Sequence, residues 1–87
     1  MIVDERNRIR MIGAGITIEK EKQFGKFVSL IPYTNIVKGL TLTGFKYPLD
    51  HYDFRGFCSL GVSNEIIAES AEIAFEEGIL IVIEARD

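Results

Sequence analysis

The sequence predicts an all-β fold, an antiparallel β-sandwich of the jelly-roll type with little or no helix. The first reason is that apolar residues mostly recur at every second position, which is the period of a β-strand. The second is that turn-forming residues interrupt these runs at short intervals, as they do in sandwiches and barrels. The third is that no segment has the clean three-four spacing of an amphipathic helix. A chain of 87 residues allows one domain at most, so residues 1–87 are treated as a single unit.

The amino-terminal part predicts a hairpin followed by a short strand. Residues 8–12 alternate charged and apolar side chains, and residues 4–7 close a turn between them and residues 2–3. The Gly-Ala-Gly sequence at 13–15 ends this strand. Residues 16–19 then alternate again and predict the next strand.

The middle of the chain predicts two further strands. Residues 26–31 are rich in β-branched and aromatic side chains, and Pro32 stops that strand. Residues 35–39 are expected to be a connection, and residues 40–43 place two leucines on one face and two threonines on the other. Gly44 interrupts this alternation, which predicts a bulge or a close approach of another backbone.

The carboxyl-terminal part predicts a final hairpin. Its strands are residues 72–75 and 79–83, and Gly78 supplies the positive φ that the turn at 76–78 needs. The last strand is apolar at every position, so it lies centrally in the sandwich or is covered by another protein surface. Residues 63–74 are the best helix candidate and are expected to form at most one turn.

The composition excludes several classes of protein. Thirteen acidic residues stand against ten basic ones, for a net charge of −3, and basic residues cluster no further than Arg6, Arg8 and Arg10. A nucleic-acid partner is therefore not expected. The longest apolar run, residues 79–83, is far below the roughly 20 residues of a membrane helix, and no signal peptide is seen. The single cysteine, Cys58, indicates a buried thiol in a cytoplasmic protein.

Two motifs contain the candidate binding residues. The first motif is residues 39–49, GLTLTGFKYPL, and the second motif is residues 60–65, LGVSNE. Tyr47 follows a predicted strand, so it lies at the rim of the sandwich, where an aromatic ring either stacks on a flat ligand or caps the core with its hydroxyl in water. Ser63 and Asn64 offer hydrogen-bond donors and acceptors, which suit either a ligand edge or a turn bonded to its own backbone. The strand pattern predicts that both motifs meet at one rim.

Residues 49–57 are expected to form a polar loop. His51 has an aspartate on either side, at 50 and 53, but this spacing matches no common metal-ligand set, which favours a solvated loop over a metal site. Glu65 has no nucleophile beside it in the sequence, and no phosphate-binding loop or nucleophile elbow is present.

In the order of its strands and in these two motifs, the chain resembles the vitamin-B1-binding domain at the carboxyl end of bacterial thiamine pyrophosphokinases. The resemblance covers nearly the whole chain and implies that Tyr47, Ser63 and Asn64 bind thiamine, with Thr43 lining the same site. Relatives can have tryptophan at the position of Tyr47, and the stretch 49–57 departs from the family pattern. The family transfers diphosphate from ATP to thiamine, giving thiamine diphosphate and AMP with Mg²⁺.

The resemblance also implies what this chain lacks. In the family, a separate amino-terminal domain binds ATP and Mg²⁺, and the enzyme is a homodimer with its thiamine pocket at the subunit junction. The chain is therefore expected to be the thiamine-binding and dimerisation part of a two-domain enzyme, without a cofactor of its own and inactive alone. The alternative is a free-standing β-sandwich that binds a protein partner or a small ligand.

Overall fold

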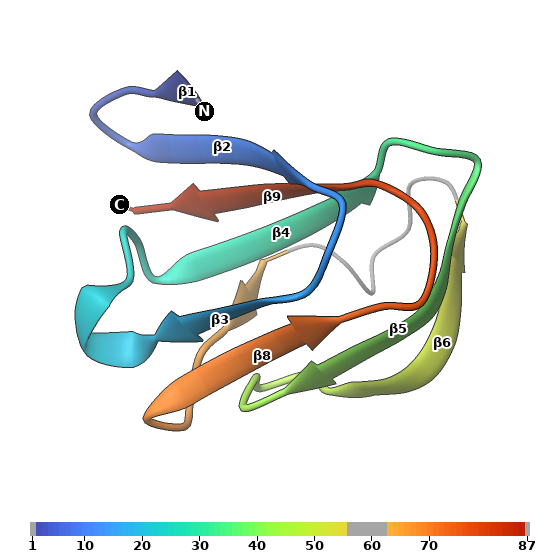
Figure 1. Ribbon diagram of the computed structural model, residues 1–87. Helices are drawn as coiled ribbons and strands as arrows, with labels where there is room; N and C mark the ends of the chain where they lie inside the picture. The colour runs from blue at the N-terminus through green and yellow to red at the C-terminus, as the bar shows by residue number, and fades with distance from the viewer. Residues whose placement is uncertain (1, 56–62, 87) are drawn as a thin grey trace.

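Two antiparallel sheets pack face to face in the structure, a computed structural model that describes residues 2–55 and 63–86 (Figure 1). The first sheet has the order β1 (Ile2–Val3), β2 (Asn7–Ile12), β9 (Leu80–Ala85), β4 (Phe27–Pro32) and β7 (Asn64–Glu65). The second has the order β3 (Ile16–Glu19), β8 (Ser70–Ala74), β5 (Ile36–Thr43) and β6 (Leu49–Arg55). One 3₁₀ turn, η1 (Lys20–Lys22), follows β3. The predicted all-β sandwich is confirmed.

The core consists of the side chains that the two sheets turn toward each other. Because side chains alternate along a strand, every second residue of each central strand enters this layer. Leu80 and Val82 of β9 are buried in this way, as are Leu40 and Leu42 of β5. The other apolar members of the core are Ile18, Val28, Leu30, Val37, Phe45, Phe54, Ile66, Ala71 and Ile73.

The prediction of a final hairpin at residues 76–78 is wrong. β8 pairs with β3 and β5 in the second sheet, whereas β9 pairs with β2 and β4 in the first. The connection between β8 and β9 therefore crosses from one sheet to the other (Figure 1). Gly78 does take a positive φ, of 117°, but it does so in a crossover and not in a two-strand turn.

Two segments that were expected to be irregular are strands. Residues 36–39 belong to β5, and most of the predicted polar loop, including His51, forms β6. β6 is an edge strand, which tolerates polar residues because its outer side faces solvent. Its alignment with β5 shifts twice, and Gly39, with a φ of 65°, lies at the first shift. These irregularities hide the strand from a search for period two.

The apolar last strand is central, as one of the two predicted alternatives required. β9 lies between β2 and β4, so its inner residues are buried and its outer residues, Ile81 and Ile83, are half-buried. Strand pairing places them on one face with further apolar side chains of β1, β2 and β4. We call this set the outer apolar face: Ile2, Ile9, Met11, Ile31, Ile81 and Ile83.

None of the helical segments within residues 2–55 and 63–86 has the length and apolar character to cross a bilayer. Cys58, which was predicted to be a buried thiol, lies outside the described residues, as does the part of the second motif before Ser63.

Candidate functional site

The two motifs identified in the sequence lie against each other. Phe45 and Ile66 form an isolated antiparallel bridge. The N–H of Lys46 donates to the carbonyl of Glu65 at 2.8 Å, and the N–H of Ile67 donates to the carbonyl of Gly44 at 2.9 Å. The prediction that both motifs share one rim is confirmed, because main-chain hydrogen bonds hold residues 44–46 beside residues 65–67.

Gly44 makes this contact possible. Its φ is 80°, a backbone conformation that residues other than glycine rarely adopt. A Cβ atom at this position would collide with the carbonyl oxygen of Ser70. The predicted close approach of another backbone is therefore confirmed, and it brings the end of β5 against the segment between β7 and β8.

Asn64 ties the two motifs together through its side chain. Its Oδ1 accepts the N–H of Tyr47 at 2.9 Å and that of Glu65 at 3.0 Å, and its Nδ2 donates to the carbonyl of Tyr47 at 2.8 Å. Asn64 is only 2% exposed. An amide has two acceptor sites and two donor hydrogens, so within the described residues one Nδ2 hydrogen has no partner. The amide therefore holds the backbone of Tyr47 in place.

Tyr47 lies where β5 gives way to β6, and its side chain is 54% exposed. The Nζ of Lys46 lies 5.5 Å from the centre of its ring, a distance at which a cation is attracted to an aromatic face. The exposed ring is thus a flat surface, on a backbone fixed by Asn64, and it suits a planar or cationic heterocycle.

Ser63 and Thr43 occupy different surroundings from those of Tyr47. Ser63 is exposed, has a φ of 55°, and donates its N–H to the Oγ of Ser29 at 2.9 Å. Thr43 lies opposite Glu72 on the solvent side of the second sheet. Among the described residues, Thr43 makes no hydrogen bond to Tyr47, Ser63 or Asn64. The structure brings Tyr47 and Asn64 into contact and places Ser63 next to Asn64 in the chain, whereas Thr43 pairs with Glu72 of β8.

The charges beside Tyr47 do not suit a divalent cation. The carboxylate of Glu65 has the Nζ of Lys26 at 3.5 Å from one oxygen and the Nζ of Lys46 at 3.6 Å from the other. Two ammonium groups at these positions repel Mg²⁺. Within residues 2–55 and 63–86, no group of three histidine, cysteine or acidic side chains has metal-binding geometry. His51 is exposed in β6, with its Nδ1 2.6 Å from Asp50 Oδ1.

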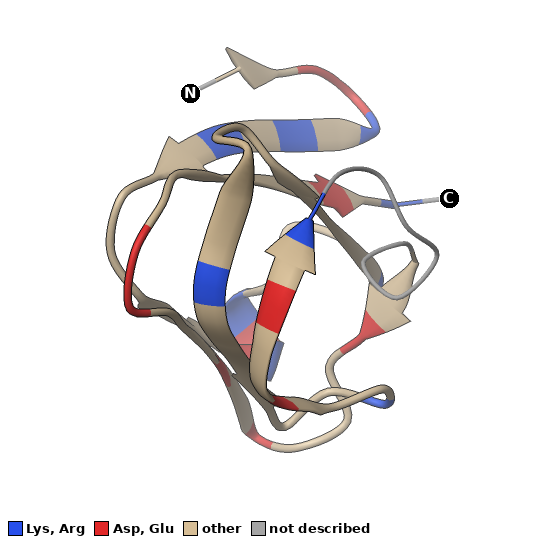
Figure 2. Cartoon of the chain, turned by 90° about the vertical axis from the view of Figure 1, so that its right-hand side faces the viewer, with Lys and Arg blue, Asp and Glu red and all other residues tan. Residues whose placement is uncertain are grey.

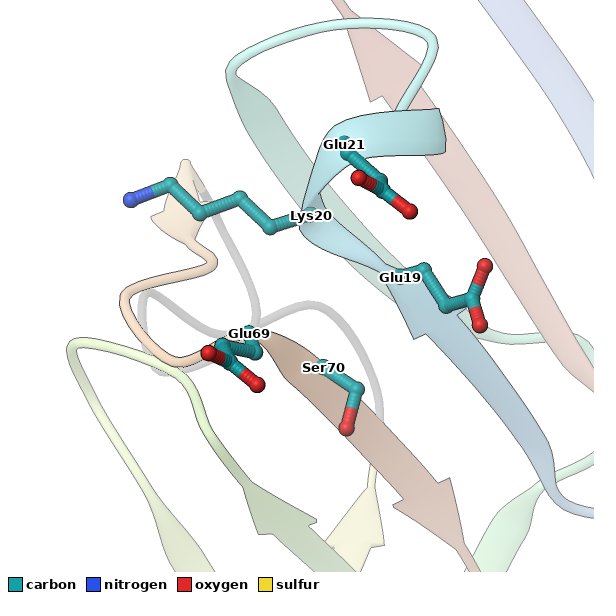
Figure 3. Close-up of a pocket in the computed structure, with 5 residues that line it drawn as sticks. All are labelled: Glu19, Lys20, Glu21, Glu69 and Ser70. Carbon is teal, nitrogen blue, oxygen red and sulfur yellow. The ribbon is translucent and has the colours of Figure 1, made fainter.

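A cavity lies where β3 passes into η1 beside the start of β8 (Figure 3). Its volume is about 690 Å³, and it is lined by Glu19, Lys20, Glu21, Glu69 and Ser70. Figure 3 shows Glu19 and Lys20 extending to opposite sides, so their charged groups do not converge. Glu19 pairs instead with Lys22, at 3.1 Å.

Sequence reasoning missed a second polar cluster, which is centred on Glu84. This carboxylate is completely buried in the sandwich. Its Oε2 accepts Nε of Arg8 at 2.8 Å, and Arg8 and Arg10 place an Nη2 at 2.6 and 3.5 Å from it. The N–H of Phe24 donates to Oε1 at 3.4 Å. The period of β9 contained the signal, because Glu84 follows Leu80 and Val82 at every second position.

Comparison of the chain with known proteins identifies its family. Residues 15–80 match the family described as thiamin pyrophosphokinase, vitamin B1 binding domain. The chain belongs to this family. The match contains the first motif, the second motif and the segments that join them, so the resemblance predicted from the sequence is confirmed.

Longer relatives carry the same domain. The chain is 38% identical over 87 residues to the thiamine pyrophosphokinase of Bacillus subtilis, covering 99% of this chain and 40% of that protein. The crystal structure of that enzyme superposes with a TM-score of 0.89 at 37% identity, covering 98% of this chain. The crystal structure of the thiamin pyrophosphokinase of Geobacillus thermodenitrificans gives a TM-score of 0.85 at 36% identity, also covering 98% of this chain. The chain therefore spans about two fifths of the length of these enzymes.

Proposed function

We propose that this chain is the thiamine-binding part of a thiamine pyrophosphokinase. The observation that carries the proposal is the exposed ring of Tyr47 on a backbone that the buried amide of Asn64 holds against the second motif. Family membership supplies the ligand class, and thiamine combines a flat pyrimidine with a cationic thiazolium ring. Both are chemistries that an exposed aromatic face attracts.

The three residues have different roles in this proposal. Tyr47 stacks on the ring system of thiamine. Ser63 offers its exposed hydroxyl to the pyrimidine, and Asn64 offers its remaining Nδ2 hydrogen while it fixes Tyr47. Stacking and hydrogen bonding bind and orient a substrate; they do not transfer a phosphoryl group.

The reaction itself is assigned to another part of the same enzyme. The transfer of diphosphate from ATP to thiamine, giving thiamine diphosphate and AMP, needs positioned Mg²⁺ and charge stabilisation around the phosphates. The lysines that flank Glu65 argue against Mg²⁺ beside Tyr47. ATP and Mg²⁺ are therefore assigned to an amino-terminal domain, the enzyme is taken to be cytoplasmic, and the 87-residue chain alone is expected to be inactive.

The outer apolar face is proposed as the surface that joins two copies of the enzyme. Met11 is 54% exposed and Ile2 is 67% exposed, while the other four residues of this face are half-buried isoleucines. An apolar patch of this kind is typical of an interaction surface. Ser63 bonds to Ser29, which lies in the same row as Ile9 and Ile83. The outer apolar face thus borders the thiamine residues, as a pocket at a subunit junction requires.

The test of the thiamine site is Tyr47→Ala in the intact enzyme. Loss of the ring is expected to raise the KM for thiamine about tenfold, while the KM for ATP stays unchanged. Tyr33→Ala is the matched control, because Tyr33 is another exposed tyrosine, 63% exposed, between β4 and β5. An unchanged KM for thiamine in Tyr47→Ala would remove the stacking role.

The test of the dimer is Met11→Glu, measured by sedimentation of the intact enzyme. A charge on the outer apolar face is expected to give monomers, whereas Lys38→Glu, at an exposed position of β5 in the second sheet, leaves the mass unchanged. A dimer that persists in Met11→Glu contradicts the assignment of this face.

A further inference from the structure

A second cavity lies at the open side of the sandwich, between β2 of one sheet and β3 of the other. Its volume is about 340 Å³, and it is lined by Arg8, Arg10, Thr17, Ile18, Glu19 and Lys22. In Figure 2, blue bands that mark lysine and arginine lie along the strand next to the amino-terminal strand, which is β2. Since water takes about 30 Å³ per molecule, the cavity has room for a small ion together with its remaining hydration.

The charges of this cavity do not balance. Strand pairing turns Arg8 and Arg10 inward, in the rows of Glu84 and Val82, so both guanidinium groups enter the space between the sheets. They share a single buried carboxylate, that of Glu84, and each arginine side chain is only 24% exposed. At the mouth of the cavity, Lys22 and Glu19 neutralise each other at 3.1 Å. One positive charge is therefore left over.

Arg10 is the residue that carries this excess charge. Arg8 contacts Glu84 through two nitrogens at 2.8 and 2.6 Å, whereas Arg10 reaches it through one nitrogen at 3.5 Å. The Nε of Arg10 is buried and finds no acceptor among the residues that the structure describes. A guanidinium has five N–H donors, so Arg10 keeps a fork of donors available in a partly desolvated place.

The opposite wall of the cavity adds further donors. β3 is an edge strand that pairs only with β8 in the described part of the chain, so its other edge turns toward β2. Thr17 and Lys22 contribute a hydroxyl group and an ammonium group to the lining. Guanidinium forks, an ammonium and a hydroxyl are the donors that bind phosphate oxygens in proteins.

We propose that the cavity between β2 and β3 binds a phosphate-type oxyanion, with Arg10 as its main ligand and Lys22 as a second. The anion neutralises the charge that Glu84 leaves unpaired and accepts the free N–H groups of Arg10. This site is separate from Tyr47 and does not depend on thiamine, so it stands or falls independently of the proposed function.

Titration of the chain with inorganic phosphate tests this proposal. The readout is the backbone amide NMR spectrum at constant ionic strength, set with chloride, and a parallel titration uses inorganic diphosphate. Saturable shifts are expected for the amides of Arg8, Arg10 and Thr17. The anion that binds with the higher affinity, phosphate or diphosphate, shows whether the site holds one phosphate group or two. The proposal is overturned if chloride alone produces the same amide shifts as phosphate, or if the shifts never saturate.

Two variants and a control locate the binding. Arg10→Gln is expected to weaken phosphate binding about tenfold, because a charge-assisted bond is lost. Lys22→Gln is expected to weaken it about threefold. Lys22 is 74% exposed, so this variant keeps the test usable if Arg10→Gln does not fold. Lys38→Gln, an exposed site on β5, is the control for loss of one positive charge. Equal affinity in Lys22→Gln and the control, or undiminished affinity in Arg10→Gln, contradicts the site.

Discussion

Asn64 and Glu84 are two buried polar residues in the same row of the first sheet, but they stabilise different things. The row runs from Arg8 through Glu84 and Val28 to Asn64, so the two residues are two strands apart, roughly 10 Å at the usual strand spacing. Asn64 is neutral and bonds to nearby backbone, at Tyr47 and Glu65. Glu84 is charged and is held mainly by long side chains from β2.

Burial affects a charged and a neutral side chain of this row differently. A buried charge without its partner costs much more than a buried amide without one. We therefore expect Glu84 to matter mainly for the folding of the sandwich, since it joins β9 to β2. Asn64 is expected to matter mainly for the shape of the candidate thiamine site, since it joins β7 to the connection between β5 and β6.

The largest effect is expected for Glu84→Ala. Removal of the carboxylate leaves two guanidinium groups facing each other at the edge of the core, at a cost of about 3 kcal/mol. That is a large share of the stability of a small domain, which is about 5 kcal/mol. Urea denaturation of the chain measures the loss. Glu72→Ala, an exposed glutamate on β8, is the control and is expected to change stability by less than about 0.5 kcal/mol.

Asn64→Ala is expected to have the next largest effect. Three hydrogen bonds are lost, and the backbone N–H and carbonyl of Tyr47 lose their partner, which costs about 2 kcal/mol. Asn64→Asp separates the accepting from the donating contacts, because it keeps both accepting contacts and sets an oxygen against the Tyr47 carbonyl. In the intact enzyme it is expected to raise the KM for thiamine more than the KM for ATP. Equal changes in both constants would indicate a purely structural role.

A smaller effect separates the two arginines that hold Glu84. Arg8→Gln is expected to lose about 1.5 kcal/mol, because Arg8 makes the two short contacts. Arg10→Gln is expected to lose less than about 0.5 kcal/mol, because its single contact is long and partly solvated. Denaturation of both variants under one set of conditions checks the order. A larger loss for Arg10 would show that Glu84 is held differently from the way its distances indicate.

The smallest effect is expected for Asp4, an exposed carboxylate that accepts hydrogen bonds from nearby backbone N–H groups, as the buried Asn64 amide does. Backbone hydrogen bonds from Arg6 and then from Asn7, at 2.8 and 2.7 Å, hold the pKa of Asp4 below its ordinary value of 3.8. A lowered pKa means that the carboxylate stabilises the folded state above its unfolded pKa, and that this is lost as pH falls through the folded pKa. The advantage over Asp4→Asn should therefore shrink as the pH falls below about 4. A gap in unfolding midpoints that stays constant with pH argues against this.

The strands that could be predicted from the sequence are those with regular alternation and a clear end. Of the predicted strands 26–31 and 40–43, residues 27–31 lie in β4 and residues 40–43 lie in β5, since their side chains fit a half-buried pleated surface and Pro32 and Gly44 mark the ends. The final hairpin was wrong because sequence alone does not say which sheet a strand joins. Two strands around Gly78 look alike whether they pair with each other or cross between sheets. That choice is made by distant partners, β2, β3, β4 and β5.

The candidate site was predictable in outline but not in its division of roles. The motifs placed Tyr47 and Asn64 together, yet only the structure shows that Asn64 bonds to the backbone of Tyr47. Which face of β2 turns toward the core could not be predicted from the sequence. Its alternation leaves open which side faces inward, and the structure turns Arg8 and Arg10 in and Ile9 and Met11 out. Glu84 selects this orientation, because a buried carboxylate needs cations.

The central position of β9 has a consequence for how the chain is made. β2 and β4 do not pair with each other; each pairs with β9. Residues 7–12 and 27–32 must therefore wait until residues 80–85 have left the ribosome before the first sheet can close. Until then their apolar edges are open to wrong pairing. A fold of this order, with its key contacts far apart in the chain, is expected to form late and slowly during synthesis.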